Sequence, residues 1–331
     1  MAQQIQQHLR IEWIDALKGI GILSVVVGHI YSGNLKLFIF LFHMPLFFFI
    51  GGFLFKPVLS FKDFFSKKTI HLLVPYFAFL VCILTPQEIM LLLDGKETIL
   101  KWIIRFVCGG VLLFEWTGVF WFTTCFFLTQ QVYNYIIVKF SYRIVWSIVA
   151  FFLMLAYANY LFFKKMYFPW AVNVVFYALP IMHLGWLYKK NSINQLYLLA
   201  FSLVSIVLLL LFWQPSVSLD MKSNSYGIPG LSFILGLSII VVLIKLAQLL
   251  EHISFIKNIL SYIGKASMVI MFMHQVIQYN VRDYVTNNAF IRIIVSLIFS
   301  IALYAIFEKF TFTRALFLGS QNDFKKVFQK K

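Results

Sequence analysis

The sequence contains little charge and little cysteine. Only 12% of its 331 residues are charged, with 12 Asp and Glu against 28 Lys and Arg, whereas charged residues make up roughly a quarter of an average soluble protein. The three cysteines, Cys82, Cys108 and Cys125, lie in apolar stretches and lack metal-ligand spacing. We therefore expect them to be packing residues, and we expect neither a disulfide framework nor a metal site.

Apolar residues are in large excess. Hydrophobic residues make up 61% of the chain, Phe alone occurs 39 times and the mean hydropathy is +0.87. A soluble globule cannot bury that much apolar surface, so the composition predicts an all-α integral membrane protein and excludes a disordered chain, a collagen and a coiled coil. The net charge of +16 comes from short basic clusters between apolar runs, which favours contact with membrane lipid and not with nucleic acid.

The apolar runs divide the chain into about ten predicted spans of roughly 20 residues. They cover residues 13–31, 36–55, 70–93, 118–138, 144–163, 168–188, 195–213, 228–249, 266–281 and 290–309. Residues 98–114 alternate basic and apolar side chains with helical spacing, which predicts one interfacial or re-entrant helix, the alternative being an eleventh span. With ten spans, most Lys and Arg fall on one side, which favours cytoplasmic termini. We expect one bundle, a single domain over 1–331, ending in a short basic tail, 313–331.

The first predicted span contains ionisable residues, which cost roughly 2.5–3.5 kcal/mol each inside a membrane. Lys18 and His29 are eleven positions apart, so a helix places both on one face, about 16 Å apart along its axis. Asp15 precedes Lys18 by three positions and can pair with it. Structural roles are the alternative. Lys18 can extend to the membrane surface, Asp15 can serve merely to neutralise Lys18, and His29 can hydrogen-bond to a neighbouring helix.

The second predicted span combines a kink, two glycines and another histidine. Pro45 removes a helix hydrogen bond, and Gly51 and Gly52 allow a backbone or a ligand to approach closely. If the first two spans form an antiparallel hairpin, His43 comes near His29. A kinked packing helix with a histidine at its mouth is the alternative.

A basic cluster follows the second span and comprises Lys62, Lys67, Lys68 and His71. The positive-inside rule explains such a cluster on topological grounds alone. The cluster would also bind the phosphates of an anionic nucleotide cosubstrate arriving from the cytoplasm.

The run from Arg10 to Phe55 closely resembles the acyltransferase-3 family of membrane O-acyltransferases, in particular its fucose 4-O-acetylase-like branch. Lys18 and His29 match a basic residue and a histidine that have ten residues between them in that family's first span. The second span matches a Phe-His-Met-Pro-Leu-Phe-Phe-Phe-Ile-Ser-Gly pattern, except that Gly51 replaces the usual Ser. Weaker matches are Val74-Pro75-Tyr76, Trp121-Phe122 and the stretch from Gly264 to His274.

The resemblance implies that an acetyl or other acyl group moves from cytoplasmic acyl-CoA to a sugar hydroxyl. Acetyl-CoA would be a cosubstrate, no cofactor would be bound, and the acceptor would be a cell-surface polysaccharide or its lipid-linked precursor. His29 would be catalytic, either as a base or as a transient acyl carrier, and Lys18 would hold the cosubstrate or balance charge. The expected location is a bacterial-type inner membrane.

The resemblance also suggests binding and supporting residues. Lys67, Lys68 and His71 would contact acyl-CoA, although the family's loop is usually rich in Arg and a Lys binds phosphate only as a point charge. The residues that would form an acceptor or supporting site are Asp15, His43, Gly51, Trp121 and His274, with Glu115 as a weaker candidate. Trp121 can alternatively be an interfacial anchor.

A multi-span transporter or flippase is the alternative function. Its buried charges would line a path for a glycan or a lipid-linked intermediate without making bonds. Transporters often place broken helices and charges in corresponding positions of two halves. Here the charges concentrate in the first two spans, which favours the transferase.

Overall fold

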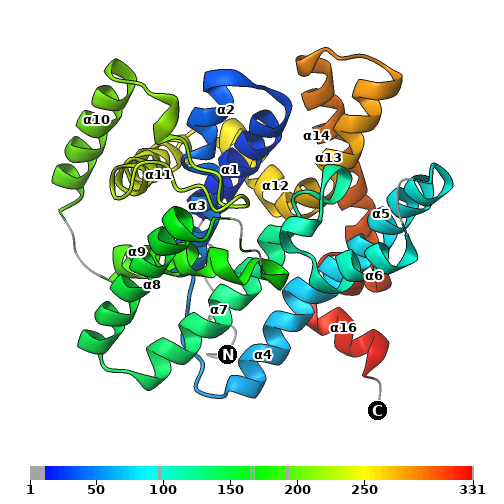
Figure 1. Cartoon of the computed structure of the whole chain (residues 1–331), viewed down its shortest axis with the longest axis horizontal. Coiled ribbons are helices and arrows are strands. Elements are labelled where there is room, and N and C mark those ends of the chain that lie inside the picture. Colours follow the sequence, from blue (N-terminus) through cyan, green and yellow to red (C-terminus); the bar gives the residue numbers. More distant parts are fainter. Residues whose placement is uncertain (1–11, 96–97, 165, 167, 191–193, 330–331) are drawn as a thin grey trace.

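The computed structural model of the chain describes residues 12–95, 98–164, 166, 168–190 and 194–329. Within these residues the regular structure is helical, apart from an isolated bridge between Asp220 and Ser225 (Figure 1). Helices suit a lipid environment because they satisfy their backbone hydrogen bonds internally. The α-helices are α1 (Glu12–Ile30), α2 (Gly33–Phe40), α3 (His43–Phe53), α4 (Phe61–Lys68), α5 (Val74–Leu93), α6 (Ile99–Cys108), α7 (Trp121–Lys139), α8 (Tyr142–Phe162), α9 (Val175–Lys190), α10 (Gln195–Leu211), α11 (Leu231–Leu250), α12 (Ser254–Lys265), α13 (Ser267–Tyr284), α14 (Ala289–Lys309), α15 (Thr311–Phe317) and α16 (Gln321–Phe328).

Every predicted span coincides with helical structure, but the number of ten is not confirmed. By length and composition, seven helical segments of the described chain can cross a membrane, and α12 with α13, bent by 74°, can form an eighth. α10 has only 17 residues, or about 26 Å, which is short of a hydrocarbon core of about 30 Å. α7 has 19 residues but buries polar side chains, among them Gln130, Gln131 and Asn134.

The segment 98–114 contains the amphipathic helix α6, none of whose residues is buried. α6 has 10 residues, or about 15 Å, so it is too short for an eleventh span. It pairs with the neighbouring α5 through Arg105, whose Nη1 lies 2.7 Å from Oε1 of Glu88. The interfacial or re-entrant position of this segment stays a prediction.

Two helix pairs pack through glycines. A Cβ on Gly264 of α12 would lie 1.9 Å from the carbonyl oxygen of Asp15 in α1, and one on Gly52 of α3 would lie 1.8 Å from that of Met182 in α9. Such close approach of two backbones is typical of membrane helices. In lipid there is no hydrophobic driving force between helices, so they associate through the close van der Waals packing that small residues permit. The contacts fix α1 against α12 and α3 against α9.

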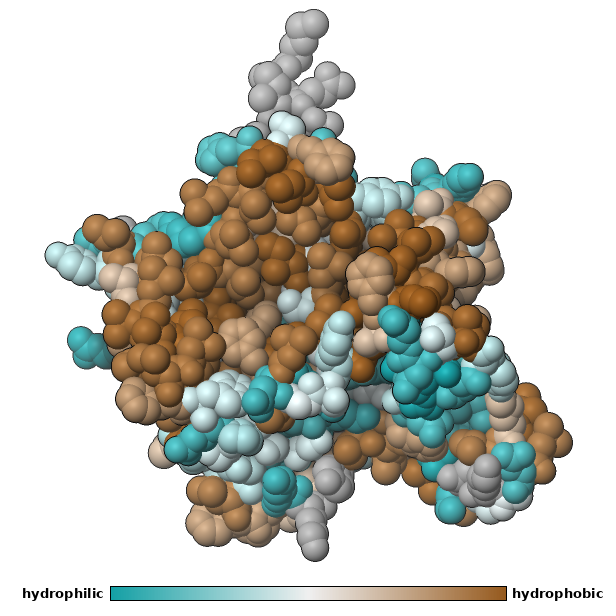
Figure 2. Space-filling view, turned by 90° about the horizontal axis from the view of Figure 1, so that it is seen from above, coloured by the Kyte–Doolittle hydropathy of each residue, from teal (hydrophilic) through white to brown (hydrophobic). Residues whose placement is uncertain are grey.

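The outer helices present apolar side chains to their surroundings. Only 22% of the spanning windows of α8 and α14 is buried, and the exposed residues include Phe151, Phe290 and Phe299. Figure 2 shows wide hydrophobic areas on one face, with hydrophilic residues gathered in one part of it. In water this surface would be unfavourable, whereas lipid tails can cover it.

Candidate functional site

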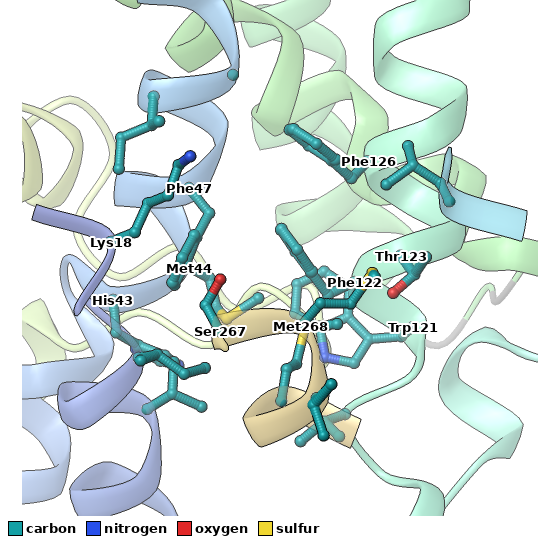
Figure 3. Close-up of a pocket in the computed structure, with 18 of the residues that line it drawn as sticks. Lys18, His43, Met44, Phe47, Trp121, Phe122, Thr123, Phe126, Ser267 and Met268 are labelled. Atoms are coloured by element: carbon teal, nitrogen blue, oxygen red, sulfur yellow. The ribbon is translucent and has the colours of Figure 1, made fainter. Parts of the chain in front are cut away.

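One cavity, with a volume of about 910 Å³, runs along α1 between α3, α7 and α13. Its lining includes ten of the residues that the sequence analysis selected: Asp15, Lys18, His29, His43, Gly51, Lys67, Lys68, His71, Glu115 and Trp121. Figure 3 shows Lys18, Met44 and Phe47 on one side, with Phe122 and Phe126 of α7 facing them. The predicted common face of Lys18 and His29 is confirmed, since both line this cavity.

The basic end of the cavity is formed by Lys67, Lys68 and His71. The two lysines end α4, and His71 lies in a π-helical turn, Thr69–Leu73, directly before α5. Pro75 near the start of α5 has no backbone N–H, so the α-helical hydrogen bond to the carbonyl of His71 cannot form. π-helical turns of this kind frequently occur at functional sites.

Lys18 lies toward the basic end and is partnered as predicted. Its Nζ is 3.4 Å from Oδ1 of Asp15, and it lies within electrostatic range of His71. The Asp15 side chain is 9% exposed, against 29% for Lys18. Lys18 therefore has its counter-ion on α1 and still faces the cavity, where it can meet an anionic ligand.

Three imidazoles lie close together at the cavity, two of them, His29 and His43, in its lining. The ring centroid of His29 lies 6.2 Å from that of His43 and 5.4 Å from that of His274. The hairpin predicted from sequence thus brings His43 near His29. His274 comes from α13 and lies directly beside the cavity lining.

Hydrogen bonds fix the orientation of two of these rings. Nδ1 of His43 donates to the carbonyl of Ile39 at 3.0 Å, and Nδ1 of His274 donates to that of Ile270 at 2.8 Å. A carbonyl oxygen only accepts, so Nε2 of each neutral ring carries the lone pair. Nε2 of His274 is buried and has no hydrogen-bond partner among the described residues. It is an available proton acceptor beside His29.

The loop end of the cavity is formed by Lys36, Glu115, Asp220 and Lys222. Nζ of Lys222 donates to the carbonyl of Leu113 at 2.6 Å, and burial lowers the pKa of Lys222 from 10.5 to about 8. Lys36 and Lys222 both lie within electrostatic range of His29. This end therefore offers charged and hydrogen-bonding groups to a polar ligand.

Sequence reasoning missed most of the loop end. Lys36 lies in the short helix α2, and Asp220 and Lys222 lie in the loop before α11. None of the three belongs to a motif. Two further lining residues, Gln275 and Tyr279 of α13, did give a signal, because they follow His274 at the point where this predicted span changes from apolar to polar residues. Glu115 was a weak candidate and lines the cavity.

Gly51 and Trp121 both belong to the cavity wall. A Cβ on Gly51 would lie 2.6 Å from a ring carbon of Phe126, so the aromatic ring fills the space that the usual Ser would take. Trp121 is only 5% exposed, so its side chain is too buried to act as an anchor in the membrane interface. Among the described residues, no group of three or more His, Cys, Asp or Glu side chains is arranged to hold a metal.

The acyltransferase-3 family model, which describes an acyltransferase domain, matches residues 11–309. The chain belongs to this family. The match contains α1 to α14 and all cavity residues named above, whereas α15 and α16 lie beyond it. No curated protein and no solved structure matches the chain. Family membership and the apolar helices together support a membrane acyltransferase.

Proposed function

We propose that the protein transfers an acetyl group from acetyl-CoA to a sugar hydroxyl of a cell-surface polysaccharide or its lipid-linked precursor, as in the fucose 4-O-acetylase-like branch. One observation carries this proposal. A single cavity joins a cationic end, suited to the phosphates of CoA, to a polar loop end, and His29 lines it within electrostatic range of the loop-end residues Lys36 and Lys222. Two substrates that enter from opposite ends can therefore meet at one imidazole.

The donor enters at the basic end. Lys67 and Lys68 attract its phosphates as point charges, and Lys18 lies further along the route toward His29. The lysine-rich side of the molecule faces the cytoplasm of a bacterial-type inner membrane, because Lys and Arg concentrate in cytoplasmic loops. In this orientation both termini are cytoplasmic, and acetyl-CoA reaches Lys67 and Lys68 directly.

His29 is the general base. It takes the proton from the sugar hydroxyl while the hydroxyl oxygen attacks the thioester carbonyl carbon. The new C–O bond forms, the C–S bond breaks and the departing CoA sulfur receives the proton from His29. His274 and His43 are positioning residues whose rings pack against that of His29, and Nε2 of His274 can accept a hydrogen bond from the ring N–H of neutral His29, at the nitrogen that does not act as the base. In the relay variant of the mechanism, His29 first carries the acetyl group itself.

The acceptor sugar occupies the loop end. Glu115 and Asp220 offer carboxylate oxygens to sugar hydroxyls, and Lys222 and Gln275 offer N–H donors. A sugar carries both donors and acceptors, so this mixture is complementary to it. Membrane lipid surrounds the bundle and can deliver a lipid-linked acceptor from the side.

The test is acetyl transfer by the purified protein in detergent or liposomes, with labelled acetyl-CoA and a panel of free and lipid-linked glycans. His29→Ala is compared with His252→Ala, an equivalent change at an exposed histidine between α11 and α12. We expect wild type and His252→Ala to label a glycan and His29→Ala to lose about 10²–10⁴-fold in rate. Equal labelling by all three proteins would remove His29 from the chemistry.

A further inference from the structure

A second, smaller pocket lies beside the basic end. Its volume is about 410 Å³, and its two walls are the basic cluster Lys67, Lys68 and His71 and the C-terminal segment 319–322. We call it the tail pocket. Lys67, Lys68 and His71 also line the main cavity, so the two spaces meet at these three side chains of the basic cluster.

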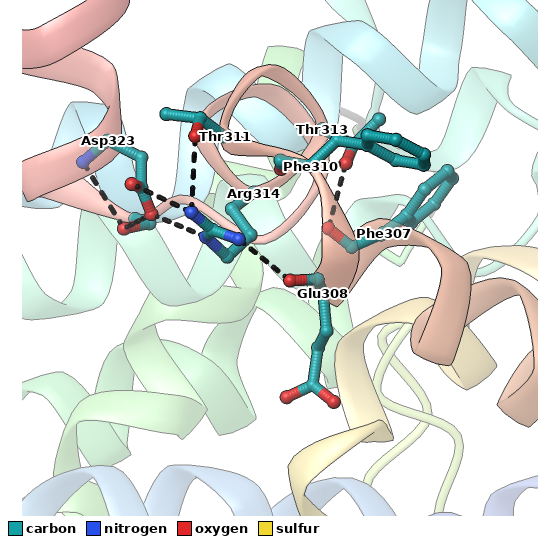
Figure 4. A network of polar contacts seen from close by, with 8 residues as sticks. Phe307, Glu308, Phe310, Thr311, Thr313, Arg314 and Asp323 are labelled. Atoms are coloured by element: carbon teal, nitrogen blue, oxygen red, sulfur yellow. Dashed lines mark hydrogen bonds and ion pairs between the residues drawn. The ribbon is translucent and has the colours of Figure 1, made fainter.

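An ion-pair network holds the C-terminal segment in place (Figure 4). Nε and Nη2 of Arg314 contact the two carboxylate oxygens of Asp323 at 2.8 and 3.2 Å, and Nη1 donates to the carbonyl of Glu308 at 2.8 Å. The hydroxyl of Ser320 donates to Asp323 at 2.7 Å. Arg314, followed by Ser320, lowers the pKa of Asp323 to about 2, so this carboxylate is ionised and neutralised by Arg314.

The segment also contacts the basic cluster directly. Nδ1 of His71 lies 3.4 Å from the carbonyl oxygen of Gly319, and Nε2 of Gln321 donates to the carbonyl of Lys67 at 3.0 Å. Gly319 has a φ of +60°, and a Cβ there would lie 2.5 Å from the carbonyl oxygen of His71. Only glycine allows both this conformation and this approach. The segment is therefore a fixed wall of the tail pocket.

We propose that the tail pocket binds the phosphorylated nucleotide end of the acyl donor, and that the segment 319–322 forms one side of this site. The inference rests on the proposed function. Lys67 and Lys68 supply positive charge for phosphate groups, while Gln321 and Asn322 supply amide side chains opposite them. The segment lies outside the region that the family model matches, 11–309, so the family does not assign it a role.

The experiment measures binding of adenosine 3′,5′-bisphosphate to the full-length protein in detergent micelles by calorimetry. Asn322→Asp adds one negative charge to the wall, and Asn322→Lys adds one positive charge. An acid in the first turn of a helix is favourable, so Asn322→Asp does not threaten the fold of α16. Gln329→Glu is the matched control, because it adds the same charge just after α16 and outside the pocket.

We expect Asn322→Asp to weaken binding about three- to tenfold and Asn322→Lys to strengthen it by a similar factor, with Gln329→Glu close to wild type. Equal binding by all variants, while Lys67→Met still weakens it, would overturn the tail pocket but leave the proposed donor intact. Failure of wild type to bind either this probe or CoA would overturn both proposals. An Asn322→Asp effect that occurs only in nanodiscs with anionic lipid would assign the pocket to a lipid headgroup and overturn the inference.

Discussion

Replacing Gly52 by Ala tests how the cavity wall is held. A Cβ at this position would lie 1.8 Å from the carbonyl oxygen of Met182, whereas real Cβ contacts are not shorter than 3.0 Å. α3 and α9 would have to separate by about 1.2 Å, and no side-chain rotation can relieve a contact with backbone. Overpacking costs about 1–3 kcal/mol, and better helix propensity returns at most about 1 kcal/mol. Because the clash is with backbone, we place the cost at the upper end, about 3 kcal/mol, and expect a net loss of about 2 kcal/mol.

The assay is thermal unfolding in detergent, followed by tryptophan fluorescence, together with the rate of acetyl transfer. Gly51→Ala is the matched control, since it changes the adjacent glycine of the same helix. Its new Cβ meets the edge of the Phe126 ring at 2.6 Å, and this ring can move. Only Gly52→Ala should lower the melting temperature clearly, and because α3 carries His43, its rate should fall as well. A Gly52→Ala protein with the same melting temperature as wild type would refute the reasoning.

Further predictions concern single side chains of the cavity. His274→Ala removes the imidazole beside His29 and should lower kcat about 10–100-fold at nearly unchanged KM for acetyl-CoA; a change confined to KM in steady-state assays would contradict its positioning role. Lys67→Met and Lys68→Met should raise KM for acetyl-CoA and reduce its dependence on salt, measured in a titration with NaCl. Burial lowers the pKa of Lys222 to about 8 in the folded protein, against 10.5 for an exposed lysine in the unfolded chain. Between about pH 8 and 10.5 the unfolded chain therefore binds more protons than the folded protein, and the stability of the fold rises with pH. Lys222→Met should reduce this rise in melting temperatures recorded across that window, and an unchanged profile would disprove the assignment.

Local periodicity made much of the fold and part of the site predictable. Long apolar runs located the long apolar helices, although not the shorter α4, α12, α15 and α16, and the helical repeat placed Lys18 and His29 on one face. The number of spans was harder to predict, because runs of similar hydropathy fold differently. α10 ends before it reaches the thickness of a membrane, and α7 carries amide side chains that lower its mean hydropathy.

The contacts between distant segments could not be predicted. The approach of His274 to His29 depends on the 74° bend between α12 and α13 and on the packing of Gly264 against α1. Lys222 reaches the cavity through a loop whose path is set by its hydrogen bond to Leu113. Neither arrangement can be predicted from the hydropathy or the spacing of the residues involved.

The same glycine contacts bear on the choice between transfer and transport. A transporter opens its path alternately to each side by moving one group of helices against another. Here the two helices that carry His29 and His43 are each fixed by backbone contact to a neighbour, α1 to α12 and α3 to α9. Opening the cavity between them would have to displace both pairs together. A transferase needs the opposite property, because its base and positioning residues work only when their geometry is held constant. The rigid support of His29 and His43 therefore favours bond making at a fixed site over passage of a glycan.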